Sequence, residues 1–269
     1  MDFQGRLDRV QQAMAECDVA VMFLPRAANL FYLAGIRRHL EHGTDHNAYG
    51  DWLSGGYLGQ TGPMRMVVPR MGGGYFMEEA RDKPWISEVR PILEPVDPTA
   101  VLRETLAGFG VGAGRNRIAV DERSWAQLAI AIGSLFPEAE IVNANEIIAP
   151  MRMIKDDDEL AAMQRASDVA DAVFAAIMPQ LRPGVSELDI SHEIDVQFIR
   201  HGAEYTSFET GVFFNGKRPD SADQTTRSGG RTLQPGDSVM FDFGGVVDGY
   251  CSDFGRSAFV GEPPAEYLR

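Results

Sequence analysis

Two aspartates, Asp242 and Asp253, stand eleven residues apart near the end of the chain. The segments that carry them, residues 238–244 and 249–260, have the composition of two strands. Asp248-Gly249 between them is a strong signal for a tight hairpin turn. The pattern therefore predicts two carboxylates held on a rigid antiparallel hairpin.

The centre of the turn decides how the carboxylates face each other. A turn centred on Val247-Asp248 places Asp242 directly opposite Asp253, and one centred on Asp248-Gly249 makes them diagonal neighbours. In both registers the two side chains leave the same face of the sheet. Like charges so placed repel each other, and a divalent metal, a shared proton or an arginine would compensate. Spacing alone is equally compatible with two aspartates on a solvated face.

The composition excludes several classes of protein. The 269 residues include 25 basic and 39 acidic side chains, a formal charge of −14, which repels nucleic acids and anionic membranes. The longest apolar run, residues 19–25, is too short to cross a bilayer, and the charged N-terminus lacks the features of a signal peptide. Cys17 and Cys251 have no metal-ligand spacing. We expect a cytoplasmic protein that acts on neither nucleic acid nor membranes.

The elements that position the hairpin fall into two domains, 1–150 and 151–269. In the first, apolar strand-like runs alternate with helical segments, which predicts a sheet covered by helices; residues 37–62, rich in Gly, His and Asp, predict a long loop. In the second, an acidic run at 156–159 precedes a long amphipathic pattern. Ser186 with Asp189 then predicts a capping box at the start of another helix.

Four stretches of the sequence have the form of family motifs. They are NLFYLAG at residues 29–35, RMIK at 152–155 followed by Glu159, PGVSE at 183–187, and QPGD at 234–237 leading into DFG and GYCSDFGR. Together they resemble the motifs of the pita-bread metallohydrolases, the group of Xaa-Pro dipeptidase (prolidase), aminopeptidase P, creatinase and methionine aminopeptidase. The resemblance covers essentially the whole chain, and the motif with the two aspartates is its most specific part.

This resemblance implies an α/β (α+β) fold: a creatinase/prolidase-like N-terminal domain followed by the first half of a pita-bread catalytic domain. It implies that Asp242 binds one of two divalent metal ions (Mn, Co or Zn) and that Asp253 bridges both. Arg256 would orient a metal-binding carboxylate from the second coordination sphere. The implied activity is hydrolysis of a C–N bond, first of all the peptide bond of a small Xaa-Pro peptide, by a homodimer.

Two departures from the family pattern leave alternatives open. The chain continues for sixteen residues after Asp253, so the histidine and two glutamates that complete the family's metal centre are not in it, and we expect the 269-residue chain to be an inactive fragment. The position of a substrate-binding histidine of the family peptidases falls on Thr225. A non-peptidase relative such as creatinase or ectoine hydrolase, a lyase, or a catalytically dead binding module therefore remain alternatives.

Two polar segments are candidates for contact with the substrate. Thr225 and Arg227 could bind a polar or anionic group, although a solvated loop explains them as well. His42 and His46 lie in the long loop together with His39, where a metal site competes with a simple polar loop. From the family we hypothesise that residues 37–62 line the active site of the partner subunit.

Overall fold

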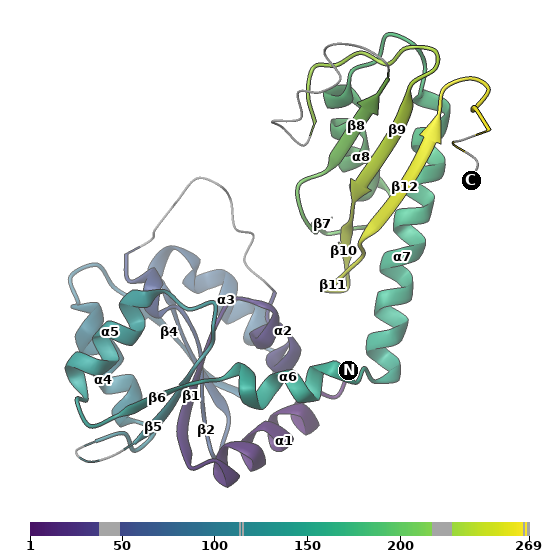
Figure 1. The fold of residues 1–269 in the computed structure, drawn as a ribbon. Helices are drawn as coiled ribbons and strands as arrows, with labels where there is room; N and C mark the ends of the chain where they lie inside the picture. Colours follow the sequence, from purple (N-terminus) through teal and green to yellow (C-terminus); the bar gives the residue numbers. More distant parts are fainter. Residues whose placement is uncertain (38–48, 113, 115, 217–227, 266, 268–269) are drawn as a thin grey trace. The chain divides into compact units, whose positions relative to one another are not determined.

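The computed structural model describes all residues except 38–48, 113, 115, 217–227, 266 and 268–269 (Figure 1). It divides into two compact units, Met1–Ile154 and Lys155–Arg269. Each unit is built around buried apolar side chains of its own. None of the helices in the described residues has the length and hydropathy that a membrane crossing requires.

The first unit contains a six-stranded sheet in the order β4-β3-β2-β1-β5-β6. Its strands are β1 (Val19–Pro25), β2 (Gly55–Gly59), β3 (Met64–Pro69), β4 (Ile86–Ile92), β5 (Arg117–Val120) and β6 (Glu140–Asn143). β2 is antiparallel to both of its neighbours, and the other pairs are parallel. The sheet is therefore mixed.

Helices cover both faces of this sheet. On one face α1 (Phe3–Glu16), α2 (Ala28–Ala34), α3 (Gly73–Ala80) and α6 (Asn145–Met153) share a core with strand residues such as Met22. On the other face α4 (Pro98–Ala107) and α5 (Ala126–Leu135) pack against residues such as Phe23. Short 3-10 turns lie at Asp51–Leu53 and Arg70–Gly72. The three layers confirm the predicted α/β class.

A buried polar network connects two of the sequence motifs. Arg152 Nη1 donates to Asn29 Oδ1 at 2.6 Å, and Asn29 Nδ2 donates to Asp121 Oδ2 at 2.7 Å. Asn29 belongs to the NLFYLAG motif and Arg152 to RMIK, so the network fastens α6 to α2 and to the end of β5. The two motifs thus serve one contact within the first unit.

The prediction of a loop throughout residues 37–62 is wrong for the part that forms β2. This strand is fully buried, and its glycines are required by close packing. A Cβ on Gly55 would lie 2.2 Å from the Leu24 carbonyl oxygen, and one on Gly56 would lie 2.6 Å from Met64 Sδ. Glycine-rich stretches are typical of loops, but here the glycines belong to a strand that packs closely against its neighbouring strands. Residues 38–48 lie outside the described part of the chain.

The second unit places two helices on one face of antiparallel strands (Figure 1). The helices are α7 (Asp157–Ile177) and α8 (Glu187–Arg200), with a 3-10 turn at Met178–Gln180. The strands are β7 (Tyr205–Thr206), β8 (Gly211–Asn215), β9 (Ser238–Phe243), β10 (Gly245–Val247), β11 (Tyr250–Cys251) and β12 (Phe254–Phe259). They form two three-stranded sheets, β12-β9-β8 and β11-β10-β7.

Capping boxes begin both helices of this unit. In α7 the Asp156 side chain accepts from Glu159 N, and Glu159 accepts from Asp156 N. In α8 the predicted pairing of Ser186 with Asp189 is confirmed. The Ser186 hydroxyl also donates to Asp189 Oδ2 at 2.7 Å, and this hydrogen bond lowers the pKa of Asp189.

Glu187, the first residue of α8, is a fully buried acid that holds three segments together. Its Oε1 accepts from Phe214 N in β8 at 2.7 Å, and its Oε2 accepts from Gly229 N at 2.8 Å. Arg231 Nε lies 2.8 Å from Oε1, with only 9% of the arginine side chain exposed. A buried carboxylate is tolerated when it is paired and fully hydrogen-bonded. Glu187 thereby fixes β8 and the 229–231 segment to the start of α8.

We expect Gly55→Ala to destabilise the first unit by about 1–3 kcal/mol or more, because the added methyl meets backbone atoms that cannot move away. Gly133→Ala is the control: this exposed glycine of α5 has open space around it, and alanine should stabilise the helix by up to about 1 kcal/mol. All three tryptophans, Trp52, Trp85 and Trp125, lie in this unit, so tryptophan fluorescence during denaturant unfolding measures its stability. Equal effects of the two substitutions would contradict the packing argument.

We expect Glu187→Gln to destabilise the second unit by about 3 kcal/mol, because it removes the negative charge that lies against the buried Arg231 guanidinium. The control is Asp248→Asn, which removes an ion pair with Arg165 whose side chains are 52% and 55% exposed, and which should cost less than about 1 kcal/mol. Hydrogen exchange of the α8 and β8 amides measures both effects within this unit. A loss of stability no larger for Glu187→Gln than for Asp248→Asn would show that the contacts of Glu187 are dispensable.

Candidate metal centre

The hairpin turn is centred on Asp248-Gly249, and this fixes the register of the strands. Both residues have positive φ angles, 49° and 77°, as a two-residue type I′ turn requires. Val247 pairs with Tyr250 in the short arms, and Gly255 pairs with Asp242 in the long arms. Of the two registers that the sequence allowed, the structure has the one with diagonal aspartates.

Aromatic packing determines which face the carboxylates occupy. Phe243 stacks on its cross-strand partner Phe254, with ring centroids 4.8 Å apart and planes 11° from parallel. Phe241 meets Phe174 of α7 at 5.6 Å. Since alternate residues of a strand point to opposite faces, burial of Phe241 and Phe243 under the helices turns Asp242 to the other face.

Asp253 follows the same rule at the start of β12. It is exposed, whereas its neighbours Ser252 and Phe254 are both buried. Its side chain therefore leaves the face that carries Asp242, which we call the open face: the face of β8, β9 and β12 turned away from α7 and α8. Diagonal neighbours of this kind lie roughly 7 Å apart. The structure thus places the two acids on one face, close enough to share a ligand.

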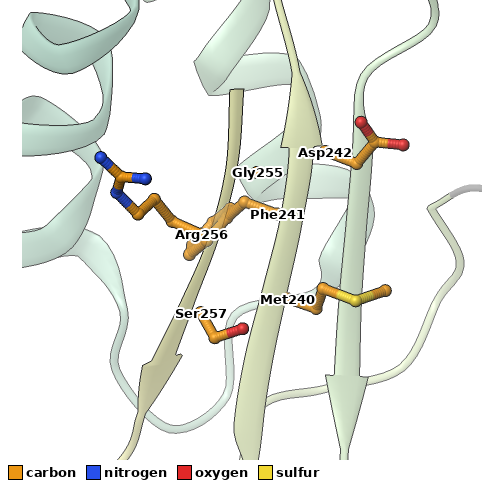
Figure 2. A pocket seen from close by; sticks show the side chains of 6 residues that line it. All are labelled: Met240, Phe241, Asp242, Gly255, Arg256 and Ser257. Carbon is orange, nitrogen blue, oxygen red and sulfur yellow. The ribbon is translucent and has the colours of Figure 1, made fainter. Parts of the chain in front are cut away.

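Glycines flank Asp242 on both neighbouring strands. Its cross-strand partners are Gly211 in β8 and Gly255 in β12. A Cβ on Gly255 would meet only the Phe241 carbonyl oxygen, at 4.0 Å. Asp242 and Gly255 line a shallow hollow of about 560 Å³ together with Met240, Phe241, Arg256 and Ser257 (Figure 2). Asp242 is therefore flanked on both neighbouring strands by residues without a side chain.

Each of the two predicted strands is broken in two, and the break lies beside Asp253. A Cβ on Gly244 would lie 2.1 Å from the Ser252 carbonyl oxygen, and one on Gly245 would lie 2.4 Å from the Phe198 ring. Gly245 N donates to Ser252 Oγ at 3.0 Å, and Ser207 N donates to the Gly244 carbonyl at 2.9 Å. The hairpin bends here and exchanges β8 for β7 as its neighbour. Strand composition alone gave no sign of this bend.

Arg256 lies on the other face of the sheet from Asp242. It pairs with Phe241, and Figure 2 shows its side chain pointing away from the Asp242 and Met240 side chains. Its guanidinium carbon lies 4.9 Å from the centroid of the Phe254 ring. A role in orienting a metal-binding carboxylate stays a prediction.

The remaining predicted site residues lie outside the described part of the chain. Thr225 and Arg227 fall within 217–227, and His42 and His46 fall within 38–48. Sequence reasoning, for its part, gave no role to Gly211, Gly255 or Glu187. The PGVSE motif includes Glu187, but only the burial of this side chain in the structure reveals its role in joining three segments. The glycines beside Asp242 become visible only once the register is known.

The donor set suits a hard divalent cation in kind but not in number. Carboxylate oxygens on a rigid hairpin are ligands of Mg²⁺, Mn²⁺ and related ions, and like charges on neighbouring strands repel each other. Among the described residues, however, no group of three or more His, Cys, Asp or Glu side chains could enclose a metal. Asp242 and Asp253 therefore fit as part of a metal centre that needs further ligands.

Comparison with known proteins divides the chain into the same two parts. The creatinase/prolidase N-terminal domain matches residues 6–154, and metallopeptidase family M24 matches residues 161–269. YkvY of Bacillus subtilis, named for a dipeptidase activity, is 28% identical over 94% of this chain and 65% of its own length. The Xaa-Pro dipeptidase of Lactobacillus helveticus is 31% identical over 70% of this chain and 50% of its own. The chain thus spans between half and two thirds of these relatives.

A solved structure shows the same fold. The prolidase of Thermococcus sibiricus superimposes with a TM-score of 0.82 over 99% of this chain and 68% of that protein, at 23% sequence identity. The creatinase/prolidase domain alone accounts for more than half of the chain, and the hairpin with its paired aspartates lies in the part that matches family M24. The resemblance indicated by the four motifs is confirmed: the chain belongs to the creatinase/prolidase family by its N-terminal domain, and its residues 161–269 are similar to metallopeptidase family M24.

Proposed function

We propose that this chain is part of a metal-dependent dipeptidase that cleaves small Xaa-Pro peptides. The observation that carries the proposal is the placement of Asp242 and Asp253 on the open face, with glycine on each side of Asp242. The names of the relatives support it, since they include an Xaa-Pro dipeptidase. Membership of a metallopeptidase family implies a divalent metal cofactor.

In this proposal Asp242 and Asp253 would both serve as ligands of divalent metal ions. Bound there, such ions would lower the pKa of a coordinated water and withdraw charge from the scissile carbonyl. The chain's own contribution is to fix the two carboxylates on one face of a rigid hairpin, with glycine on both strands beside Asp242. Manganese, cobalt and zinc all remain candidates for the ions.

Further ligands must come from residues beyond those described. The family resemblance implies a histidine and two glutamates, which the complete product of the gene would have to supply. The proposal therefore concerns that complete product, and the 269 residues taken alone would be inactive. A homodimer in the cytoplasm, with His42 and His46 near the partner's site, is part of the same proposal.

One sequence observation favours a second candidate. The position of a substrate-binding histidine in the family peptidases is Thr225 here, and the chain has no histidine after His201. A hydrolase of another C–N bond, of the creatinase or ectoine hydrolase type, could dispense with that histidine. A substrate panel of Xaa-Pro dipeptides, creatine and ectoine separates the two candidates.

We expect Asp242→Asn and Asp253→Asn, made in the complete gene product, to lower the affinity for Mn²⁺ at least about tenfold and to abolish hydrolysis of Xaa-Pro dipeptides, because each removes a charged ligand. Asp248→Asn is the matched control, since Asp248 lies on the same hairpin and pairs with Arg165 instead. Titration calorimetry and a proline-release assay measure the two effects. If the Asp242 and Asp253 variants kept both metal and activity, the assignment would be refuted.

A further inference from the structure

The open face carries an apolar pair, Met240 and Phe213, next to Asp242 and Asp253. Met240, two residues before Asp242 on β9, points the same way as Asp242 (Figure 2). Its direct cross-strand partner on β8 is Phe213, and on β12 it is Ser257. Opposed side chains have Cβ atoms about 5 Å apart, so Met240 and Phe213 form one continuous apolar surface.

This pair is accessible in the described structure. Met240 is 44% exposed, although the residues on either side of it, Val239 and Phe241, are buried in the core. Phe213 is half-buried, between the buried Val212 and Phe214. Exposure of a large apolar side chain to water costs free energy, and contact with another apolar group removes that cost. Met240 also lines the hollow that contains Asp242.

Spacing along the strand relates this pair to the aspartates. Residues two apart on one face are separated by about 7 Å, the extended length of a dipeptide. Gly255 is the residue opposite Asp242, and Ser257 is the residue opposite Met240. Asp253 comes two residues before Gly255, so it lies on the side of Asp242 away from Met240. A dipeptide gripped between the aspartates can therefore lay a side chain across Met240 and Phe213.

We propose that Met240 and Phe213 form a specificity subsite that selects an apolar side chain in the substrate, at the position next to the aspartate pair. This inference rests on the proposed function, since it takes Asp242 and Asp253 as the point where the substrate is held. Apolar contact without polar partners favours aliphatic and aromatic side chains over hydroxylated or charged ones.

The test uses the metal-loaded complete gene product and the dipeptides Leu-Pro, Phe-Pro and Ser-Pro. Met240→Ser should lower kcat/KM for Leu-Pro and Phe-Pro about tenfold relative to Ser-Pro, mainly through KM, because the contact is made equally in the ground and transition states. Met240→Leu should restore the preference. Val196→Ser is the control, since Val196 on α8 is 43% exposed, close to the 44% of Met240.

A binding measurement makes the result independent of turnover. Leucine hydroxamate and serine hydroxamate chelate metals alike and differ only in the side chain. We expect the unmodified protein to bind leucine hydroxamate about tenfold more tightly, and Met240→Ser to lose this preference while keeping its metal.

The possible outcomes separate the inference from the function on which it rests. An unchanged side-chain preference in Met240→Ser overturns the subsite. Joint loss of metal and thermal stability in that variant also overturns it, because Met240 would then be covered by other protein rather than by substrate. If no Xaa-Pro dipeptide is cleaved but the hydroxamate preference depends on Met240, the proposed peptidase activity fails and the apolar subsite stands.

Discussion

The register of β9 against β12 is the constraint on which the candidate site depends. A slip of one residue would bury Asp242 beneath α7 and expose the phenylalanines that now fill the core. Two independent features prevent it: the type I′ turn at Asp248-Gly249 and the stacked pair Phe243–Phe254. The turn and the apolar packing specify the same register. This register places both aspartates on the same face of the sheet.

Glu187 and the pair of aspartates, all in the second unit, carry their negative charges in different surroundings. Glu187 is buried, and its charge is balanced internally by Arg231 and by two backbone N–H groups. Asp242 and Asp253 are placed beside each other on a face that stays accessible, in a chain whose formal charge is −14. Paired carboxylates in that setting favour binding of a cation. The first arrangement stabilises the fold, and for the second we propose a role in metal binding.

Much of this could be predicted from the sequence because the signals were local. Asp248-Gly249 specified the turn, alternation placed the aspartates on one face, and Ser186 with Asp189 marked a helix start. The errors arose where tertiary packing decides. Gly55 and Gly56 looked like a loop but form a buried strand, and the bend at Gly244 depends on Ser252 and Ser207, which no local pattern connects. That glycines flank Asp242 on both sides likewise follows only from the register of three strands.

We propose that Asp242 and Asp253 together hold a pair of metal ions on the open face. The most direct test is anomalous diffraction at the manganese edge from crystals of the complete gene product grown with Mn²⁺. We expect two neighbouring anomalous peaks, with Asp242 contacting one ion and Asp253 contacting both. Ions bound elsewhere, with both carboxylates left in solvent, would contradict it.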